Sequence, residues 1–394
     1  MRADIQGYAQ ALLPKLVKTR QHLHRHPELS FEEVQTMNYV AAQLDDLGIP
    51  YQKGIAGTGI VALIEGPESG KCIALRADMD ALPIAEQNEV PYKSLNEGVM
   101  HACGHDVHTT CLLGAAEILW QNRSSLKGTV KLIFQPGEEQ SPGGASLMIE
   151  AGALKDPVPD AIIGLHVFPE LPSGYLGFRA GQYMASADEI HITIKGKGGH
   201  AALPQSTIDP IVIAANIIVQ LQQIVSRRSH PLTPTVLSFG HINGGHVTNV
   251  IPEEVTLKGT LRTFDESWRK EAVRLIHEIV NHNCAAWGAT AVIDSPPGYP
   301  CLYNDEALTA SVKGYAEEYL GADYIKPLDM RMTAEDFSFY TQEIPGCFFR
   351  LGTNKDNKEY MVPVHNPHFD IDEAALVTGA GTMAWAALSY LLGS

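Results

Sequence analysis

The stretch Met100-His101-Ala102-Cys103-Gly104-His105-Asp106-Val107-His108 crowds metal-capable and nucleophilic side chains together more densely than any other part of the chain. Residues 109–120 follow with the small and apolar pattern of a buried helix, so Cys103 and His105 are predicted at a helix N-terminus, which favours a thiolate. A thiol and an imidazole separated by one glycine can bind the same cation, and zinc accepts both ligand types. Two ligands do not complete a site. A structural loop with capping histidines and a small apolar cysteine is the alternative for this stretch alone.

Short apolar runs on both sides of this stretch predict the strands of a sheet. They cover residues 59–64, 72–76, 129–134 and 160–165, with helical patterns between them. This alternation predicts a layered α/β domain with a mostly parallel sheet. Nearer the N-terminus, Ser30 and Glu33 form a capping-box pattern before a helix.

Acidic residues and a histidine follow these predicted strands where each one ends. Asp78 and Asp80 follow one strand, Glu138 and Glu139 follow another, and His166 ends a third. The loops at the carboxyl ends of an open α/β sheet can converge on one site. Adjacent carboxylates repel each other unless a cation or a proton is shared, so Glu138 and Glu139 indicate a site more strongly than a solvated turn. One of these two acids can bind a metal while its neighbour acts as a general base, whereas the two aspartates can equally be turn residues.

The sequence pattern changes after residue 182. Residues 183–296 read as strand, helix, strand, strand, helix, strand, which is the order of a ferredoxin-like domain. The proline-rich segment 296–300 then marks a boundary, after which mixed α/β patterns return and include a histidine-rich loop at His365. We therefore predict a first domain made of residues 1–182 and 297–394, with residues 183–296 inserted into it.

Charge, cysteine content and the N-terminal sequence argue against nucleic-acid binding, membrane association and secretion. The net charge of −16 argues against nucleic acid or an anionic membrane as the main partner. The six cysteines show no compact pairing pattern, which fits reduced thiols. The N-terminus lacks the apolar core of a signal peptide, and no run of about 18 apolar residues occurs anywhere, so we expect a cytoplasmic protein without a membrane partner.

Six segments, in order along essentially the whole chain, carry a family resemblance. They are Asp78-Met79-Asp80-Ala81-Leu82-Pro83, the stretch from Met100 to Asp106, Gly137-Glu138-Glu139, Gly164-Leu165-His166, Gly198-Gly199-His200-Ala201-Ala202-Leu203-Pro204 and His365-Asn366-Pro367. Together they resemble metal-dependent amidohydrolases that include hippurate hydrolase, N-acyl-amino-acid hydrolases, related carboxypeptidases and plant auxin-conjugate hydrolases. The resemblance implies an α/β metallohydrolase catalytic domain with a mostly parallel sheet, and an inserted ferredoxin-like α+β domain that acts as a lid and as a homodimer interface.

The resemblance also implies roles for individual residues. Two divalent ions, Zn, Mn, Co or Ni, would be held by five ligands: Cys103, His105, Glu139, His166 and His365. Glu138 would be the general base, and Asp80 would support the ligands from behind. Wider relatives place a histidine ligand where this chain has Asp78, so Asp78 is not counted as a ligand.

Three residues of the inserted domain match positions that contact substrate in related enzymes. His200 would stabilise the oxyanion, while Asn249 and Arg262 would hold a substrate carboxylate. A turn asparagine and a solvated strand arginine are the alternatives for the last two. Glu335 and Asp336 also resemble a family segment, without a role that the sequence can assign.

The resulting hypothesis is hydrolysis of the amide bond of N-acyl amino acids, such as hippurate-like or acetyl amino acids, to a carboxylic acid and a free amino acid. A carboxypeptidase or dipeptidase acting on short peptides through the same two-metal centre is the nearest alternative. Thiol hydrolysis, with Cys103 as the nucleophile and His105 as the base, is a second alternative. A non-catalytic metal-binding protein is the third.

Overall fold

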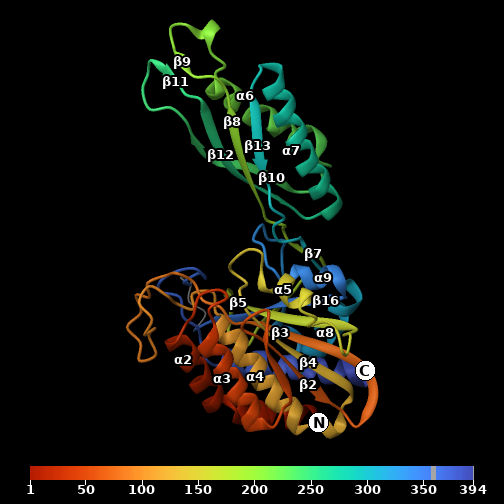
Figure 1. Ribbon diagram of the computed structural model, residues 1–394. Coiled ribbons are helices and arrows are strands. Elements are labelled where there is room, and N and C mark those ends of the chain that lie inside the picture. The colour runs from red at the N-terminus through yellow and green to blue at the C-terminus, as the bar shows by residue number, and fades with distance from the viewer. Residues whose placement is uncertain (356–360, 394) are drawn as a thin grey trace. The chain divides into compact units, whose positions relative to one another are not determined.

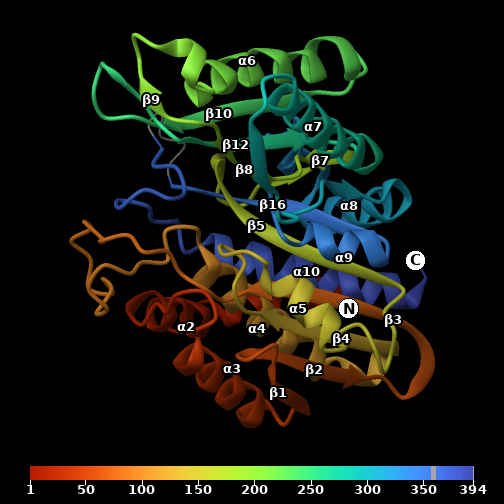
Figure 2. The same cartoon turned by 45° about the horizontal axis from the view of Figure 1, so that its top comes forward.

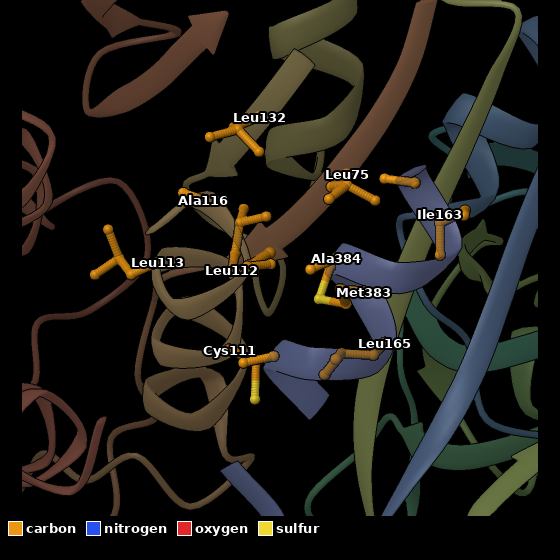
Figure 3. Close-up of a cluster of buried hydrophobic side chains, with 14 of the residues drawn as sticks. Leu75, Cys111, Leu112, Leu113, Ala116, Leu132, Ile163, Leu165, Met383 and Ala384 are labelled. Carbon is orange, nitrogen blue, oxygen red and sulfur yellow. The ribbon is translucent and has the colours of Figure 1, made fainter. Parts of the chain in front are cut away.

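Helix α4 (His105–Gln121) begins directly after Gly104, earlier in the chain than the apolar pattern predicts. The computed structural model describes residues 1–355 and 361–393. In it, α4 is buried along most of its length because its residues are small or apolar, and it packs against α10 (Ala375–Leu392). Figure 3 shows the apolar side chains that fill the space between these helices and the sheet, among them Leu75, Leu112 and Met383.

A mixed sheet forms the layer next to α4. Within the described residues it has eight strands, in the order β1-β2-β4-β3-β5-β16-β6-β15. Neighbours from β4 through β3 and β5 to β16 are parallel, and β1 and β2 extend the sheet with antiparallel pairs. The mostly parallel sheet predicted from the sequence is confirmed. The strands are β1 (Tyr51–Ile55), β2 (Gly59–Glu65), β3 (Glu68–Asp78), β4 (Lys127–Gln135), β5 (Ala161–Pro172), β6 (Leu176–Phe178), β15 (Ile325–Pro327) and β16 (Gly346–Asn354).

The carboxyl ends of the central strands lie level with one another. Asp78 ends β3 opposite Gln135, which ends β4. His166 lies two residues beyond the Arg76–Gly164 pair, so it is level with Asp78. Strand β5 itself continues past this point because it stays paired with β16. The prediction that His166 ends its strand is therefore wrong, although the residue does lie at the edge where its neighbours end.

The two faces of β3 differ in character because alternate side chains point to opposite sides. Ile73 and Leu75 belong to the apolar core under α4 and α10. Arg76 faces the other layer, which contains α5 (Gly144–Glu150) and α9 (Ser338–Glu343), because it donates to Asp336, which also accepts from the N–H of Ala145 in α5. Figure 1 shows α5 and α9 above β3 and β4, and α4 below these two strands. The second face is thus polar although it is buried.

Lys131 of β4 is a further buried charge on this polar face. Its side chain is 0% exposed, and its ammonium donates to the carbonyl oxygens of Ala153, Lys155 and Pro157 at 3.0, 2.6 and 2.7 Å. Burial lowers the pKa of this amine. Three acceptors satisfy the three donors of the ammonium, so Lys131 ties the loop after α5 to the sheet.

Two compact units account for the chain. One, which we call the sheet unit, comprises Met1–Gly181, Tyr303–Met330 and Asp336–Ser394, and the other, the inserted unit, comprises Gln182–Leu302 and Arg331–Glu335. Outer helices of the sheet unit are α1 (Arg2–Ala11), α2 (Leu13–Arg25), α3 (Val34–Leu47) and α8 (Glu306–Leu320), while the short strands β7 (Gly181–Met184) and β14 (Leu302–Asn304) lie at the unit boundaries. Figure 2 shows α2, α3 and α4 beside one another.

Among the described residues, two helical segments are long and apolar enough to cross a membrane by length and composition alone. They are α10 and Pro210–Arg228, and neither was predicted as such from the sequence. In α10, 78% of the apolar window is buried. A helix that is apolar on all sides and surrounded by its own protein belongs to a core.

The inserted unit has the predicted order of elements. Its strands alternate buried and exposed residues, as Ile190, Ile192 and Ile194 do in β8, and the buried face packs against α6 and α7. The sheet order β10-β12-β8-β13, with antiparallel neighbours, is that of a ferredoxin-like fold. The elements are β8 (Asp188–Lys195), α6 (Pro210–Gln223), β10 (Thr235–Asn243), β12 (Glu254–Thr263), α7 (Glu266–Ala286), β13 (Thr290–Asp294) and the small pair β9 (Gly199–His200) and β11 (Val250–Ile251).

Candidate metal centre

Gly104 allows the Cys103 loop to approach strand β5 closely. Its φ is +82°, and a Cβ atom at this position would lie 2.7 Å from the Val167 side chain. Only glycine adopts this conformation without strain and leaves room for that contact. As a result, Cys103 Sγ lies 3.4 Å from Nε2 of His166, the residue before Val167.

His166 presents one ring nitrogen to Cys103 and uses the other for the backbone. Nδ1 lies 2.8 Å from the Val167 carbonyl oxygen, which assigns the proton to Nδ1 and leaves a lone pair on Nε2. Burial, and after it the charge of Arg350, holds the pKa of His166 well below its ordinary value. A neutral imidazole with a free Nε2 is the form that binds a metal.

His105 is held in the same manner by Asp80. Nδ1 of His105 lies 3.0 Å from Asp80 Oδ1, while its Nε2 is buried and has no hydrogen-bond partner. Burial alone would lower the pKa of His105, but the charges of Asp78 and Asp80 together raise it to about 10. These carboxylates therefore favour a positive charge at this position, which a bound cation would also provide.

The acid pair follows β4, with Glu139 turned toward the histidines. Glu139 Oε1 lies 4.0 Å from His105 Nε2 and 3.2 Å from His365 Nε2, and it is buried without a hydrogen-bond partner. The backbone N–H of Glu139 donates to Asp80 Oδ2 at 3.0 Å. Glu138 is 7% exposed and accepts from the backbone N–H of Asp336 at 3.4 Å.

His365 closes the cluster from its exposed side. Its backbone N–H donates to the carbonyl oxygen of Ala102 at 2.8 Å, which fixes the two loops together. Its φ is +63°, a conformation that is uncommon outside glycine and that is often found at functional sites. The His365 side chain is 51% exposed, so the cluster opens to solvent here.

The clustered atoms fit divalent cations. Among the described residues, five groups have ligand atoms within 4.8 Å of one another, and three of them join the predicted site residues: Cys103 with His105 and His166, Cys103 with Glu139 and His365, and His105 with Glu138 and Glu139. A cation would satisfy the two buried atoms that lack partners, His105 Nε2 and Glu139 Oε1. The mixture of sulfur, nitrogen and oxygen donors suits first-row divalent metals. Because the groups share residues, the arrangement could hold two neighbouring ions.

His108 and Asp78 lie beside this cluster, but their polar atoms are already occupied. Nδ1 of His108 lies 2.5 Å from Asp78 Oδ1, and its Nε2 accepts the backbone N–H of Val167 at 2.9 Å. The other oxygen of Asp78 accepts from Arg76 at 2.6 Å. These two residues support the cluster and leave no ring nitrogen of His108 for a metal.

A buried polar network behind the site was not predicted from the sequence. Asp336, for which the sequence indicates no role, accepts from Arg76 at 2.7 Å, from Gln135 at 2.7 Å and from the backbone of Ala145 at 2.9 Å. Glu335 belongs to the inserted unit. One local indication of this network is Arg76, a charged residue in the apolar run of β3, because a buried arginine requires a carboxylate partner.

The predicted capping box is wrong. Helix α3 begins at Val34 and has no side-chain cap. Ser30 Oγ instead donates to Asp80 Oδ2 at 2.7 Å, and Glu33 is buried and accepts from the backbone N–H of Gly137 at 2.8 Å. Ser30 and Glu33 have the spacing of a capping box, but both side chains bond to loops of the candidate site instead.

The state of Cys103 also differs from the expectation for a helix N-terminus. Burial, followed by the charges of Glu139 and Glu138, raises the pKa of the Cys103 thiol well above its ordinary value. A bound cation reverses this balance because it deprotonates a coordinating thiol. The imidazole that meets Sγ is that of His166, whereas the thiol-hydrolase alternative assigned His105 as the base.

The three predicted substrate contacts all lie in the inserted unit. His200 and Asn249 are close neighbours, because His200 pairs with Val250 and the N–H of Ala201 donates to the carbonyl oxygen of Asn249 at 3.0 Å. Arg262 lies in β12 and donates to the carbonyl oxygen of Met332 at 3.1 Å. The structure therefore brings His200 and Asn249 together and places Arg262 on another strand.

An acid pair beside a thiol and imidazoles, at the carboxyl edge of an α/β sheet, is the set of side chains expected of a metal-dependent hydrolase. The profile of Peptidase family M20/M25/M40 matches residues 74–389, so the chain belongs to this family of peptidases and amidohydrolases. The chain is 43% identical over 363 residues to the N-acetyl-L-cysteine deacetylase of Bacillus subtilis, covering 92% of this chain and 85% of that one. It is 41% identical over 381 residues to the IAA-amino acid hydrolase ILR1-like 4 of Arabidopsis thaliana, covering 96% and 86%.

A solved structure shares the fold. The crystal structure of Bacillus subtilis YXEP, a dinuclear metal-binding peptidase of the M20 family, aligns with a TM-score of 0.82 and 36% sequence identity, covering 97% of this chain and 99% of that chain. Because the match spans both units, the likeness includes the α/β sheet and the antiparallel inserted unit.

Proposed function

We propose that this protein hydrolyses the amide bond of N-acyl amino acids, with two divalent metal ions held by Cys103, His105, Glu139, His166 and His365. The observation that carries the proposal is the acid pair after β4: one carboxylate turns toward two imidazoles, and the other is buried beside it. Relatives named as an N-acetyl-L-cysteine deacetylase and an IAA-amino acid hydrolase support an amino-acid conjugate as the substrate.

Each residue has a distinct task in the proposed reaction. Bound metal ions supply Lewis-acid polarisation of the amide carbonyl and make water more acidic. Glu138 takes the proton from the attacking water and transfers it to the leaving amine. Asp80 holds His105 through its Nδ1, and the Val167 carbonyl oxygen does the same for His166, so both imidazoles keep Nε2 toward the site.

We also propose that the inserted unit binds the substrate. His200 would donate to the developing oxyanion, and Asn249 and Arg262 would bind the carboxylate of the amino-acid part. Support for these roles is the resemblance of the segments that carry the three residues to segments of the family. The pairing of β9 with β11 holds His200 and Asn249 in the same small ribbon.

The direct test measures amino-acid release from a panel of benzoyl, acetyl and indoleacetyl amino acids and dipeptides, with metal-loaded protein and a chelated control. Chelator-sensitive release from acyl amino acids is the expected result. Preference for dipeptides would favour the carboxypeptidase or dipeptidase alternative on the same site. Chelator-resistant release that is abolished by alkylation would move the chemistry to Cys103, and no release from any substrate would contradict the proposal.

The role of Glu138 is tested by Glu138→Gln. The amide retains the shape of the side chain but cannot accept a proton, so we expect kcat to fall by about 10²- to 10⁴-fold with both metals retained. Glu139→Gln is the matched control at the neighbouring position, and there we expect loss of bound metal, measured by elemental analysis. Near-normal turnover of Glu138→Gln would remove this residue from the role.

A further inference from the structure

The segment 29–33, which we call the clamp segment, lies against two loops of the metal centre. Leu29 forms a parallel bridge with Ala81, the residue after Asp80, and the N–H of Ala81 donates to the Glu28 carbonyl oxygen at 2.8 Å. Ser30 Oγ donates to Asp80 itself at 2.7 Å. The clamp segment is therefore fixed to the loop that supports His105.

Glu33 connects the clamp segment to the loop of the acid pair. Its side chain is 0% exposed, and Oε1 accepts from the backbone N–H groups of Phe31 and Gly137, both at 2.8 Å. Its other oxygen accepts from the Thr58 hydroxyl at 2.5 Å. One buried carboxylate thus bonds the clamp segment, the Gly137 loop and the turn before β2.

The ring of Phe31 also lies against Gly137. The φ of Phe31 is +67°, a strained conformation for a bulky residue, which persists only where its surroundings enforce it. A Cβ atom on Gly137 would lie 2.3 Å from the Phe31 ring. The ring and the Glu33 carboxylate therefore both constrain the position of Gly137.

These contacts fix the backbone on both flanks of Glu138. Before it, the Gly137 N–H is held by Glu33, and after it, the Glu139 N–H is held by Asp80 at 3.0 Å. Two buried carboxylates, from segments about 50 residues apart in the sequence, therefore accept from the first and third backbone N–H groups of the tripeptide 137–139. The backbone of Glu138 therefore lies between two anchored N–H groups.

We propose that Glu33 is a positioning residue that sets the reach of Glu138 toward the scissile amide by holding the Gly137 N–H. This inference rests on the hydrolysis proposed above. Glu33 touches neither substrate nor metal in this role. It acts through the backbone of the acid-pair loop, and Phe31 acts with it.

The test compares three variants for kcat, KM, bound metal and hydrogen exchange in the peptide that contains Gly137. Glu33→Met keeps the size of the side chain but removes both acceptor oxygens. Glu33→Gln keeps one acceptor oxygen for the N–H groups of Phe31 and Gly137, and its amide NH₂ can donate to the Thr58 hydroxyl, which can accept as well as donate. Glu28→Met is the matched control, because the Glu28 carboxylate accepts from Gln35 and Thr36 at the start of α3 and does not contact Gly137.

For Glu33→Met we expect kcat to fall on the order of 10²-fold, with KM and metal content near the wild-type values and faster exchange at Gly137. Glu33→Gln should restore most of kcat, and Glu28→Met should keep it. Wild-type kcat in metal-loaded Glu33→Met, or equal losses in Glu33→Met and Glu28→Met, would overturn the proposal.

A second variant keeps the inference testable if Glu33→Met does not fold. Phe31→Ala releases Gly137 without removing the buried acceptor, and it should lower kcat and speed exchange in the same peptide, whereas unchanged values of both would overturn the clamp. The two proposals also fail separately. If the wild-type protein hydrolyses nothing in the panel, the proposed function fails, and exchange at Gly137 still decides whether Glu33 holds this loop.

Discussion

Three buried histidines near the candidate centre differ in what their two ring nitrogens contact. In His105 and His166, Nδ1 meets an acceptor and Nε2 is left for a metal. In His108 both nitrogens have partners, so it supports its neighbours instead. Three histidines within a few ångströms therefore have different capacities to bind metal, although the residue type is the same.

Asp80 should control metal affinity through its two oxygens. One accepts from His105, and the other accepts from Ser30 and from the backbone of Glu139. In Asp80→Asn, an amide NH₂ replaces one of these acceptors and faces donors. We expect metal affinity to fall by about 10- to 100-fold, measured by competition with a chromogenic chelator.

The control is Asp160→Asn. Asp160 accepts from the backbone N–H of Cys72, near the start of β3 and away from the ligands. Its substitution should leave metal affinity unchanged. Equal affinity in Asp80→Asn and the wild-type protein would show that Asp80 does not orient His105.

Residue chemistry allowed the candidate ligands to be proposed from the sequence, because cysteine, histidine and paired carboxylates are uncommon together at strand ends. It did not allow the supporting network to be proposed. Arg76 and Asp336 are 260 positions apart, and no local pattern joins them. The capping-box error at Ser30 has the same origin, since its actual partner, Asp80, lies 50 positions away.

Among the elements, helix α4 depends most on a single residue at its start. Gly104 has φ +82° and approaches Val167 closely. Gly104→Ala should lower the free energy of unfolding by about 1–2 kcal/mol for the left-handed backbone, with about 1–3 kcal/mol more for the contact with Val167. Urea denaturation of the metal-free protein would measure both contributions together.

Gly98 separates the two contributions to this loss. Its φ is +76°, but nothing lies within 4 Å of a Cβ atom placed there. Gly98→Ala should therefore show only the backbone contribution. If the two substitutions cost the same free energy, the close approach between Gly104 and Val167 is not important for stability.

Periodicity was a good guide to the existence of elements and a poor one to their ends. It located the apolar cores of β2, β3 and β4, whose side chains alternate or are buried in runs. It ended β5 too early, because the further pairing of β5 with β16 joins segments far apart in the chain. An element's length depends on its partners as much as on its own residues.

At the scale of the whole molecule, each unit has its own apolar core, and the five candidate metal ligands all lie in the sheet unit. A ligand that binds only the folded state stabilises the part that holds it. Chelation should therefore speed hydrogen exchange in peptides of α4 and β5 and leave β8, β12 and α7 unchanged. Restoring the metal should reverse the effect, and faster exchange throughout both units would contradict this localisation.

The change of pattern after residue 182 made an inserted α+β unit predictable, because half-exposed antiparallel strands alternate whereas buried parallel strands do not. The return of Arg331–Glu335 to the inserted unit was not predictable. Two backbone hydrogen bonds hold Arg331 there, to Tyr183 at 2.9 Å and to Ala185 at 3.1 Å. Backbone pairing of this kind requires no particular side chain, so the sequence carries no mark of it.

The rate at which the Lys131 amine reacts can report how often the sheet unit opens. It is buried, whereas every other lysine that the structure describes is at least partly exposed. Amine-directed acylation should therefore label the other lysines promptly and Lys131 only in molecules whose loop at 153–157 has separated from β4. Mass spectrometry of that one peptide would time the opening of the native sheet without an added probe.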